Sequence, residues 1–290
     1  MNRLFILVMS LSIISTITLH AEKADTMSKK ITYPAANHAT DTYTLTPEWK
    51  LVWADEFEGD TLNPANWNYQ VEPAGRFNEE WQRYTNSVEN AYVEDGNLVI
   101  KAIHESDKHG LDQYTSARLN TANKQAWKHG RVAARIQMPY GEGMWPAFWL
   151  LGNNIYENGG DTPWPATGEI DVMEFYGSKD DGAIEVNMHY EGADGKHAQM
   201  GARKYQLKQG MFAENYHVFE LEWNDSEMIW YVDGEEITRK DISKPVYSEF
   251  HQPFFILLNI AVGGKHSGRP DNTTQFPQYM YVDWVRVYQK

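Results

Sequence analysis

From about Trp49 onward, the chain is a succession of short apolar or alternating segments separated by turn residues. The clearest segments cover residues 98–103, 131–136, 219–223, 228–232, 254–261 and 280–288. Asp233-Gly234 follows one of them and is a dipeptide typical of a tight β-hairpin. Because helical periodicity is weak throughout, the pattern predicts an all-β fold, a sandwich of sheets.

The N-terminal residues form a segment of different character. Residues 1–21 have the composition of a signal peptide, with Arg3 before an apolar stretch and small Ala21 at the end. Residues 22–46 are polar and without periodicity, which predicts a flexible leader. Residues 47–290 contain no linker or repeat and are predicted to form a single domain. The protein is therefore expected to be secreted or periplasmic, with no membrane anchor after signal cleavage.

Composition limits the class of partner. The net charge of the 290-residue chain is −14, which argues against nucleic acid as a ligand, because such binding requires a basic surface. A neutral ligand fits better. The 11 Trp and 17 Tyr residues supply flat rings that suit stacking on sugars. The chain has no cysteine, so neither a disulfide nor a lipid-anchored cysteine is available. The protein is expected to be a monomer.

The acidic stretch at residues 168–175 has three carboxylates among apolar residues, and its β-forming side chains predict a strand. Alternation places Glu169 and Asp171 on one face, and a one-residue bulge at Val172-Met173 would return Glu174 to that face. Hydrolysis of a glycosidic bond needs two carboxyl groups, one protonated and one ionised. A solvated outer face or a hard-cation site are the alternative interpretations.

Tryptophans flank the acidic stretch. Trp145 and Trp149 fall on the same face of a predicted strand, with small Ala147 between them. This arrangement suggests an open platform on which a sugar ring stacks, although two core tryptophans would give the same pattern. Trp164, just before the acidic strand, is a third candidate for substrate contact.

Polar residues elsewhere are further candidates for substrate binding. They are Glu80 in a polar-aromatic cluster, the nearby Asn86, Arg118 in a β context, and His189, which shares a face with Asn187. Each residue alone is weak evidence for substrate binding, since an arginine usually forms a surface ion pair and a lone histidine is usually structural.

Taken in order, several motifs resemble glycoside hydrolase family 16, and most closely its laminarinase-type endo-β-1,3-glucanases. The matching segments are residues 53–57, 80–85, 114–118, 145–149, 168–174, 258–264 and 282–288. The resemblance extends over residues 49–290. It implies a β-jelly roll of two stacked antiparallel sheets, with a concave face that forms a substrate cleft, and hydrolysis with retention of configuration.

The resemblance also implies roles for individual residues. Glu169 would be the nucleophile, Glu174 the general acid/base, and Asp171 would hydrogen-bond the nucleophile and tune the protonation of the pair. Catalysis would need no cofactor. A structural calcium would bind at Asp283 with a backbone carbonyl near Gly96, although Asp283 is equally consistent with a turn or an ion pair.

The expected substrate is a β-1,3-linked glucan cleaved at internal bonds. Three alternatives remain open: a galactanase acting on agarose or carrageenan, a transglycosylase, and a non-hydrolytic β-glucan-binding protein. Relatives that only bind glucan typically lose one or more of the motif carboxylates, and this chain keeps all three, which favours an enzyme.

Overall fold

The computed structural model describes residues 41–178 and 180–290, all of which belong to one compact unit. The predicted signal peptide and the predicted leader up to residue 40 lie outside the described residues. Within the described part, no helix has the length and apolar character needed to cross a membrane.

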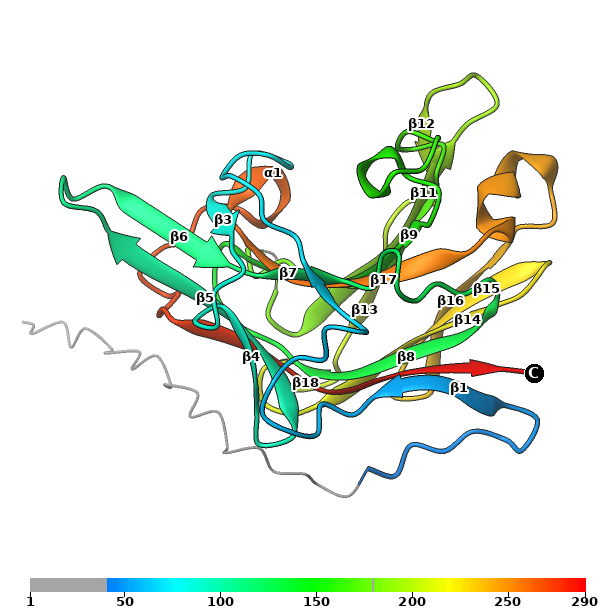
Figure 1. Ribbon diagram of the computed structural model, residues 1–290, viewed down its shortest axis with the longest axis horizontal. Helices are drawn as coiled ribbons and strands as arrows, with labels where there is room; N and C mark the ends of the chain where they lie inside the picture. Colours follow the sequence, from blue (N-terminus) through cyan, green and yellow to red (C-terminus); the bar gives the residue numbers. More distant parts are fainter. Residues whose placement is uncertain (1–40, 179) are drawn as a thin grey trace, which may run out of the picture. The chain divides into compact units, whose positions relative to one another are not determined.

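The described strands form two sheets (Figure 1). In spatial order, the ten-stranded sheet contains β16 (Glu235–Asp241), β15 (Glu227–Val232), β14 (His217–Trp223), β8 (Gly130–Gln137), β18 (Gln278–Gln289), β5 (Asn97–Ser106), β6 (Asp112–Ser116) and β3 (Gln82–Tyr84), with β1 (Lys50–Asp55) paired to β18 and β4 (Ala91–Glu94) paired to β5. The eight-stranded sheet contains β12 (His197–Gln199), β11 (Ala183–Glu191), β10 (Glu169–Glu174), β9 (Met144–Gly152), β17 (Phe254–Val262), β7 (Arg118–Asn120) and β2 (Asn68–Tyr69), with β13 (Arg203–Gln206) paired to β11.

Pairing between these strands is antiparallel, apart from the parallel pair β3–β6. The helical segments of the described chain are short: η1 (Tyr156–Asn158), η2 (Pro245–His251) and α1 (Gly264–Ser267). The prediction of an all-β fold is confirmed, and each of the predicted apolar segments lies in a strand. The Asp233-Gly234 hairpin is also confirmed: it joins β15 to β16, and both residues have positive φ, as a tight type I′ turn requires.

The hydrophobic core fills the space between the two sheets. Phe148 and Leu150 on β9 point into it, as do Leu258 on β17 and Val285 on β18, and these side chains are almost completely buried. Burial of one such side chain contributes roughly 1.5–3 kcal/mol. Because side chains alternate along a strand, the other face of β9, β10 and β17 is left to line a surface outside the core.

The end of the predicted leader, residues 41–46, makes contacts with the ten-stranded sheet. The Tyr43 hydroxyl donates a hydrogen bond to Glu220, and its ring centroid lies 5.1 Å from that of Trp284. Asp41 forms an ion pair with Arg286 on β18. These contacts attach the chain to the outer face of the sheet before the predicted domain boundary at residue 47.

Candidate active site

The carboxylates lie on β10, next to a bulge. Asp171 is opposite Trp149 on β9 and Glu174 is opposite Ala147, so three steps along β10 match two steps along β9. The pairing with β11 shifts at the same place. The bulge predicted at Val172-Met173 is therefore confirmed, and it returns Glu174 to the face that carries Asp171.

The core explains why the bulge forms where it does. Val172 and Met173 are both buried among the apolar residues between the sheets, together with Ile170. Two consecutive side chains can face the core only if the strand carries an extra residue. Below the bulge, the Trp230 indole N–H donates a 3.0 Å hydrogen bond to the backbone oxygen of Asp171, which holds the strand in this shape.

Glu169 and Glu174 each accept a hydrogen bond from a different indole. Trp164 Nε1 donates to Glu169 Oε2 at 3.0 Å, and Trp145 Nε1 donates to Glu174 Oε1 at 3.0 Å. The Tyr176 hydroxyl also hydrogen-bonds Glu174. These donors orient the two carboxyl groups and lower their pKa values relative to burial alone.

Asp171 and His189 occupy the space beside Glu169. His189 Nε2 lies 3.1 Å from Asp171 Oδ2 and 3.9 Å from Glu169 Oε1. His189 is opposite Glu169 in the β10–β11 register, which explains why the two side chains meet. The sequence-based pairing of Asn187 with His189 on one face is also observed, since Asn187 Nδ2 lies 3.2 Å from His189 Nε2.

The carboxyl groups are shifted toward their protonated forms. Burial raises the pKa of Glu174 to about 8, and the charge of Asp171 adds to the shift. Burial is also the main cause of the raised pKa of Glu169, followed by the neighbouring charge of Asp171, whereas His189 and the Trp164 N–H act in the opposite direction. The cluster therefore retains a proton near neutral pH, as acid catalysis requires.

The prediction of an open platform at Trp145 is wrong. Only 6% of Trp145 is exposed, because its ring packs against Tyr176 and His266 while its N–H is directed at Glu174. Trp149 is partly buried, and its N–H donates to Asn259 at 2.8 Å. Among the three predicted tryptophans, Trp164 is the open one, with 44% of its surface exposed.

Arg118 packs against aromatic rings instead of forming a surface ion pair. Its guanidinium lies 4.6 Å from the Trp149 ring and 4.5 Å from the Phe77 ring, and its Nε donates to Gln70 at 2.9 Å. The side chain is buried and packs against the Trp149 ring.

Glu80 is buried in a hydrogen-bonded cluster beside β3. Its Oε2 accepts hydrogen bonds from Gln82 at 2.8 Å and from the Tyr84 hydroxyl at 3.2 Å. Asn259 donates to the same hydroxyl at 3.3 Å, which links Glu80 to the Trp149 indole. Asn86 is exposed in the loop between β3 and β4, and the described contacts do not join it to the carboxylates.

His197 belongs to the site, although it is not among the residues that the sequence predicts there. Its Nε2 lies 2.8 Å from His189 Nδ1, and its ring centroid is 4.7 Å from that of Trp164. His197 lies on β12, which pairs with β11. The sequence feature that points to His197 is Asp194-Gly195, a dipeptide typical of a hairpin turn, because a turn there places β12 beside His189.

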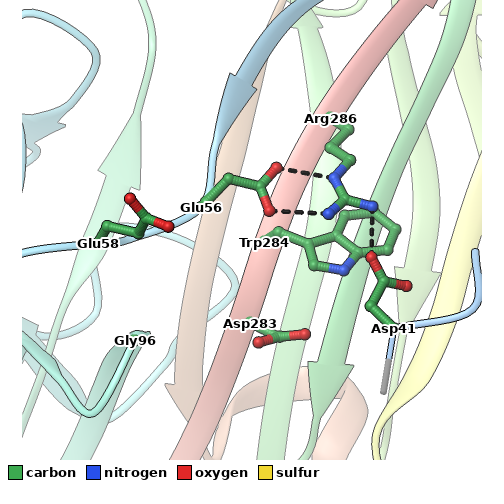
Figure 2. Close-up of a pocket in the computed structure, with 7 residues that line it drawn as sticks. All are labelled: Asp41, Glu56, Glu58, Gly96, Asp283, Trp284 and Arg286. Carbon is green, nitrogen blue, oxygen red and sulfur yellow. Dashed lines mark hydrogen bonds and ion pairs between the residues drawn. The ribbon is translucent and has the colours of Figure 1, made fainter. Parts of the chain in front are cut away.

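The predicted calcium residues line a pocket on the ten-stranded sheet (Figure 2). Its volume is about 310 Å³, and it is lined by Asp41, Glu56, Glu58, Gly96, Asp283, Trp284 and Arg286. Asp283 forms an ion pair with Arg135 at 2.6 Å, and Arg286 forms ion pairs with Asp41 and Glu56. Four carboxylates and one arginine leave the lining negative, and its oxygen-rich donors fit the chemistry of calcium.

Comparison with known proteins is consistent with this site. Residues 78–286 match the family model described as glycosyl hydrolases family 16. A glucan endo-1,3-beta-glucosidase A1 from Niallia circulans is 38% identical over 83% of this chain, which spans only 38% of that relative's length. A beta-glucanase from Rhodothermus marinus is 36% identical over 83% of this chain and 86% of its own length.

A solved structure shares the fold. The laminarinase catalytic domain of Thermotoga maritima MSB8 superposes with a TM-score of 0.73 at 39% sequence identity, and the match covers 84% of this chain and 99% of that one. The expected β-jelly roll is thereby confirmed. The chain belongs to family 16 of the glycosyl hydrolases.

Proposed function

We propose that this protein is a laminarinase-type endo-β-1,3-glucanase that hydrolyses its substrate with retention of configuration. The observation that carries the proposal is the bulge of β10, which brings Glu169, Asp171 and Glu174 to one face outside the core. The names of the similar glucanases and laminarinase support β-1,3-glucan as substrate. The signal peptide predicted at residues 1–21 would deliver the enzyme outside the cytoplasm, where polymeric glucan is met.

The first step forms a covalent glycosyl-enzyme. Glu169 attacks the anomeric carbon, while Glu174 gives its proton to the oxygen of the departing sugar. The pKa values of Glu169 and Glu174 are both raised to about 8, so the division of roles is supported by the resemblance of residues 168–174 to the family motif. The charges of the neighbouring carboxylates raise both pKa values further, which favours a state in which one of the two carboxyl groups holds a proton.

The second step releases the sugar. Once its proton has gone, Glu174 is ionised and removes a proton from a water molecule that attacks the anomeric carbon. The bond to Glu169 breaks, and the configuration of the sugar is restored by this second inversion. Asp171, buried beside Glu169, influences when each carboxyl is charged, because like charges at short range disfavour simultaneous ionisation.

Loss of the Trp164 N–H is expected to weaken catalysis. Trp164→Phe keeps an aromatic ring but removes the donor to Glu169 Oε2. A hydrogen bond to a charged group contributes about 1.5–3 kcal/mol, so kcat/KM on laminarin should fall about tenfold or more. Trp53→Phe is the matched control, because Trp53 Nε1 donates to Asn66 instead. Equal activity of both variants would show that the indole N–H does not assist Glu169.

A panel of polysaccharides tests the substrate. Reducing-sugar release is expected to be fastest on laminarin, slower on the mixed-linkage glucan lichenan, and negligible on agarose and κ-carrageenan. A ladder of short oligosaccharides early in the reaction is expected from internal cleavage. Release from agarose or carrageenan but not laminarin would assign the enzyme to the galactanases, and laminarin binding with no release at all would make it a binding protein.

We also propose that the pocket in Figure 2 holds a structural calcium, bound by the Asp283 carboxylate and the Gly96 carbonyl with help from Glu58. Calcium would neutralise the negative charge that the four carboxylates leave in excess of Arg135 and Arg286. The melting temperature should therefore be several degrees higher in calcium than in EDTA, since a ligand of the folded state stabilises it.

Two variants make the calcium experiment specific. Asp283→Asn should remove the difference between calcium and EDTA. Arg135→Gln breaks the same ion pair but keeps the carboxylate, so it should lower the melting temperature and preserve the calcium effect. A melting temperature of the unmodified protein that does not respond to calcium would contradict the proposal.

A further inference from the structure

Three atoms able to bind a metal ion converge at the start of β10. They are Glu169 Oε1, Asp171 Oδ2 and His189 Nε2, and all lie within 4.8 Å of one another. His189 Nε2 lies 3.1 Å from Asp171 Oδ2 and 3.9 Å from Glu169 Oε1. Two ligands placed about 2.0–2.1 Å from a tetrahedral zinc ion are about 3.3 Å apart, which these separations bracket.

The orientation of His189 suits a metal ligand. Its Nδ1 lies 2.8 Å from His197 Nε2, so the two rings share one hydrogen bond. The Asn187 amide nitrogen, which can only donate, lies 3.2 Å from His189 Nε2 and requires a lone pair there. In the tautomer that a metal ligand requires, Nδ1 carries the hydrogen and donates it to His197, and Nε2 keeps its lone pair. Metal-ligating histidines are held in this way, with the second ring nitrogen donating to a neighbour.

A buried acceptor in the same place lacks a partner. Among the described residues, Asp171 Oδ2 accepts no hydrogen bond, although Asp171 is only 3% exposed. The oxygen faces the lone pair of His189 Nε2 across 3.1 Å. Two electron-rich atoms at this distance need a proton or a metal cation between them, and a metal ion that replaces the proton would also reach Glu169.

We propose that Glu169, Asp171 and His189 form a binding site for Zn²⁺, with His197 as the outer partner that orients the histidine, and that the bound ion inhibits the enzyme. A nitrogen ligand and three closely spaced donors favour zinc over calcium, which prefers six to eight oxygen ligands. The inhibition rests on the proposed function: a lone pair of Glu169 that binds zinc cannot attack the anomeric carbon.

Zinc binding is tested first, without reference to activity. Titration of the full-length protein with Zn²⁺ in a calorimeter should reveal a saturable site, and His189→Gln should weaken it by about tenfold or more. His197→Phe should weaken it by roughly tenfold to a hundredfold, because it removes only the outer partner. The control is His104→Gln. His104 lies 2.8 Å from Asp112, but the described residues place no third ligand there.

Inhibition is tested on the same proteins. Zn²⁺ should suppress laminarin hydrolysis by the unmodified enzyme and by His104→Gln at the concentration that fills the site, and EDTA should restore activity. Melting curves establish that each variant is folded, and Asp171→Asn replaces His189→Gln if the latter does not fold. No saturable site, or equal weakening by His104→Gln and His189→Gln, would overturn the site. Binding without inhibition would overturn the inhibitory role alone, and lack of activity before zinc is added would count against the proposed function only.

Discussion

Glu169→Gln is expected to reduce kcat/KM on laminarin by at least about 10⁴-fold, a loss typical of removal of a central catalytic group. The amide has nearly the shape of the carboxyl group and can still accept the Trp164 N–H, but it cannot form the covalent intermediate. The fold and the cleft should therefore remain. Kinetics on laminarin, a melting curve, and binding of a laminarin oligosaccharide measure these three properties separately.

Two further variants sharpen the first prediction. Glu105→Gln removes an exposed carboxylate on β5, in the ten-stranded sheet and not in the sheet that contains β10, and should leave kcat/KM unchanged. Glu169→Ala leaves space for azide, which should attack from the side of the missing carboxylate and give the glycosyl azide of inverted configuration. Near-normal hydrolysis by Glu169→Gln would refute the assignment of the nucleophile.

Glu174→Gln is expected to lower kcat on laminarin by about 10²- to 10⁴-fold, the usual contribution of a general acid. The amide keeps the hydrogen bond from Trp145 but has no acidic proton to transfer. On a dinitrophenyl β-glycoside of a laminarin oligosaccharide, formation of the glycosyl-enzyme should remain fast, because the leaving phenolate is stable without protonation. The measurement is the burst of dinitrophenolate, followed by slow turnover.

The dependence on the leaving group distinguishes acid catalysis from a general disturbance of the site. Loss of activity in Glu174→Gln by the same factor on both substrates would contradict the assignment of Glu174 as the acid. Glu174→Ala with azide should give the glycosyl azide of retained configuration, since the intermediate on Glu169 still forms. The two azide products together assign one glutamate to each face of the sugar.

Local chemistry explains why much of the site could be found from the sequence. The alternation of residues 168–175 predicts which side chains share a face, and the extra residue at Val172-Met173 follows from the need to return Glu174 to that face. Both features depend on neighbours along one strand. The hairpin at Asp233-Gly234 is local in the same sense, because its turn geometry requires residues that tolerate positive φ.

Interactions between strands decided what the sequence left open. Trp145 and Trp149 have the same alternation pattern as an exposed platform, but the packing of Tyr176 and His266 buries Trp145. Likewise, the sequence makes Arg118 a candidate for substrate binding, with a surface ion pair as the alternative, and Phe77 and Trp149 enclose it. A side chain's exposure depends on which distant segments cover it, and single-strand periodicity carries no information about that coverage.

The sequence by itself determined the all-β class, the strand that carries the three carboxylates, and the face they share, because these follow from period-two alternation and turn chemistry. Only the tertiary structure decided which indole N–H reaches which glutamate, and that His197 lies against His189. Those contacts join β9, β10, β11, β12 and the loop before β10. Apart from the contact of Trp164, which lies in the loop, they arise from the register of paired strands. Register is a property of two chain segments at once, so it becomes definite only when the sheets have formed.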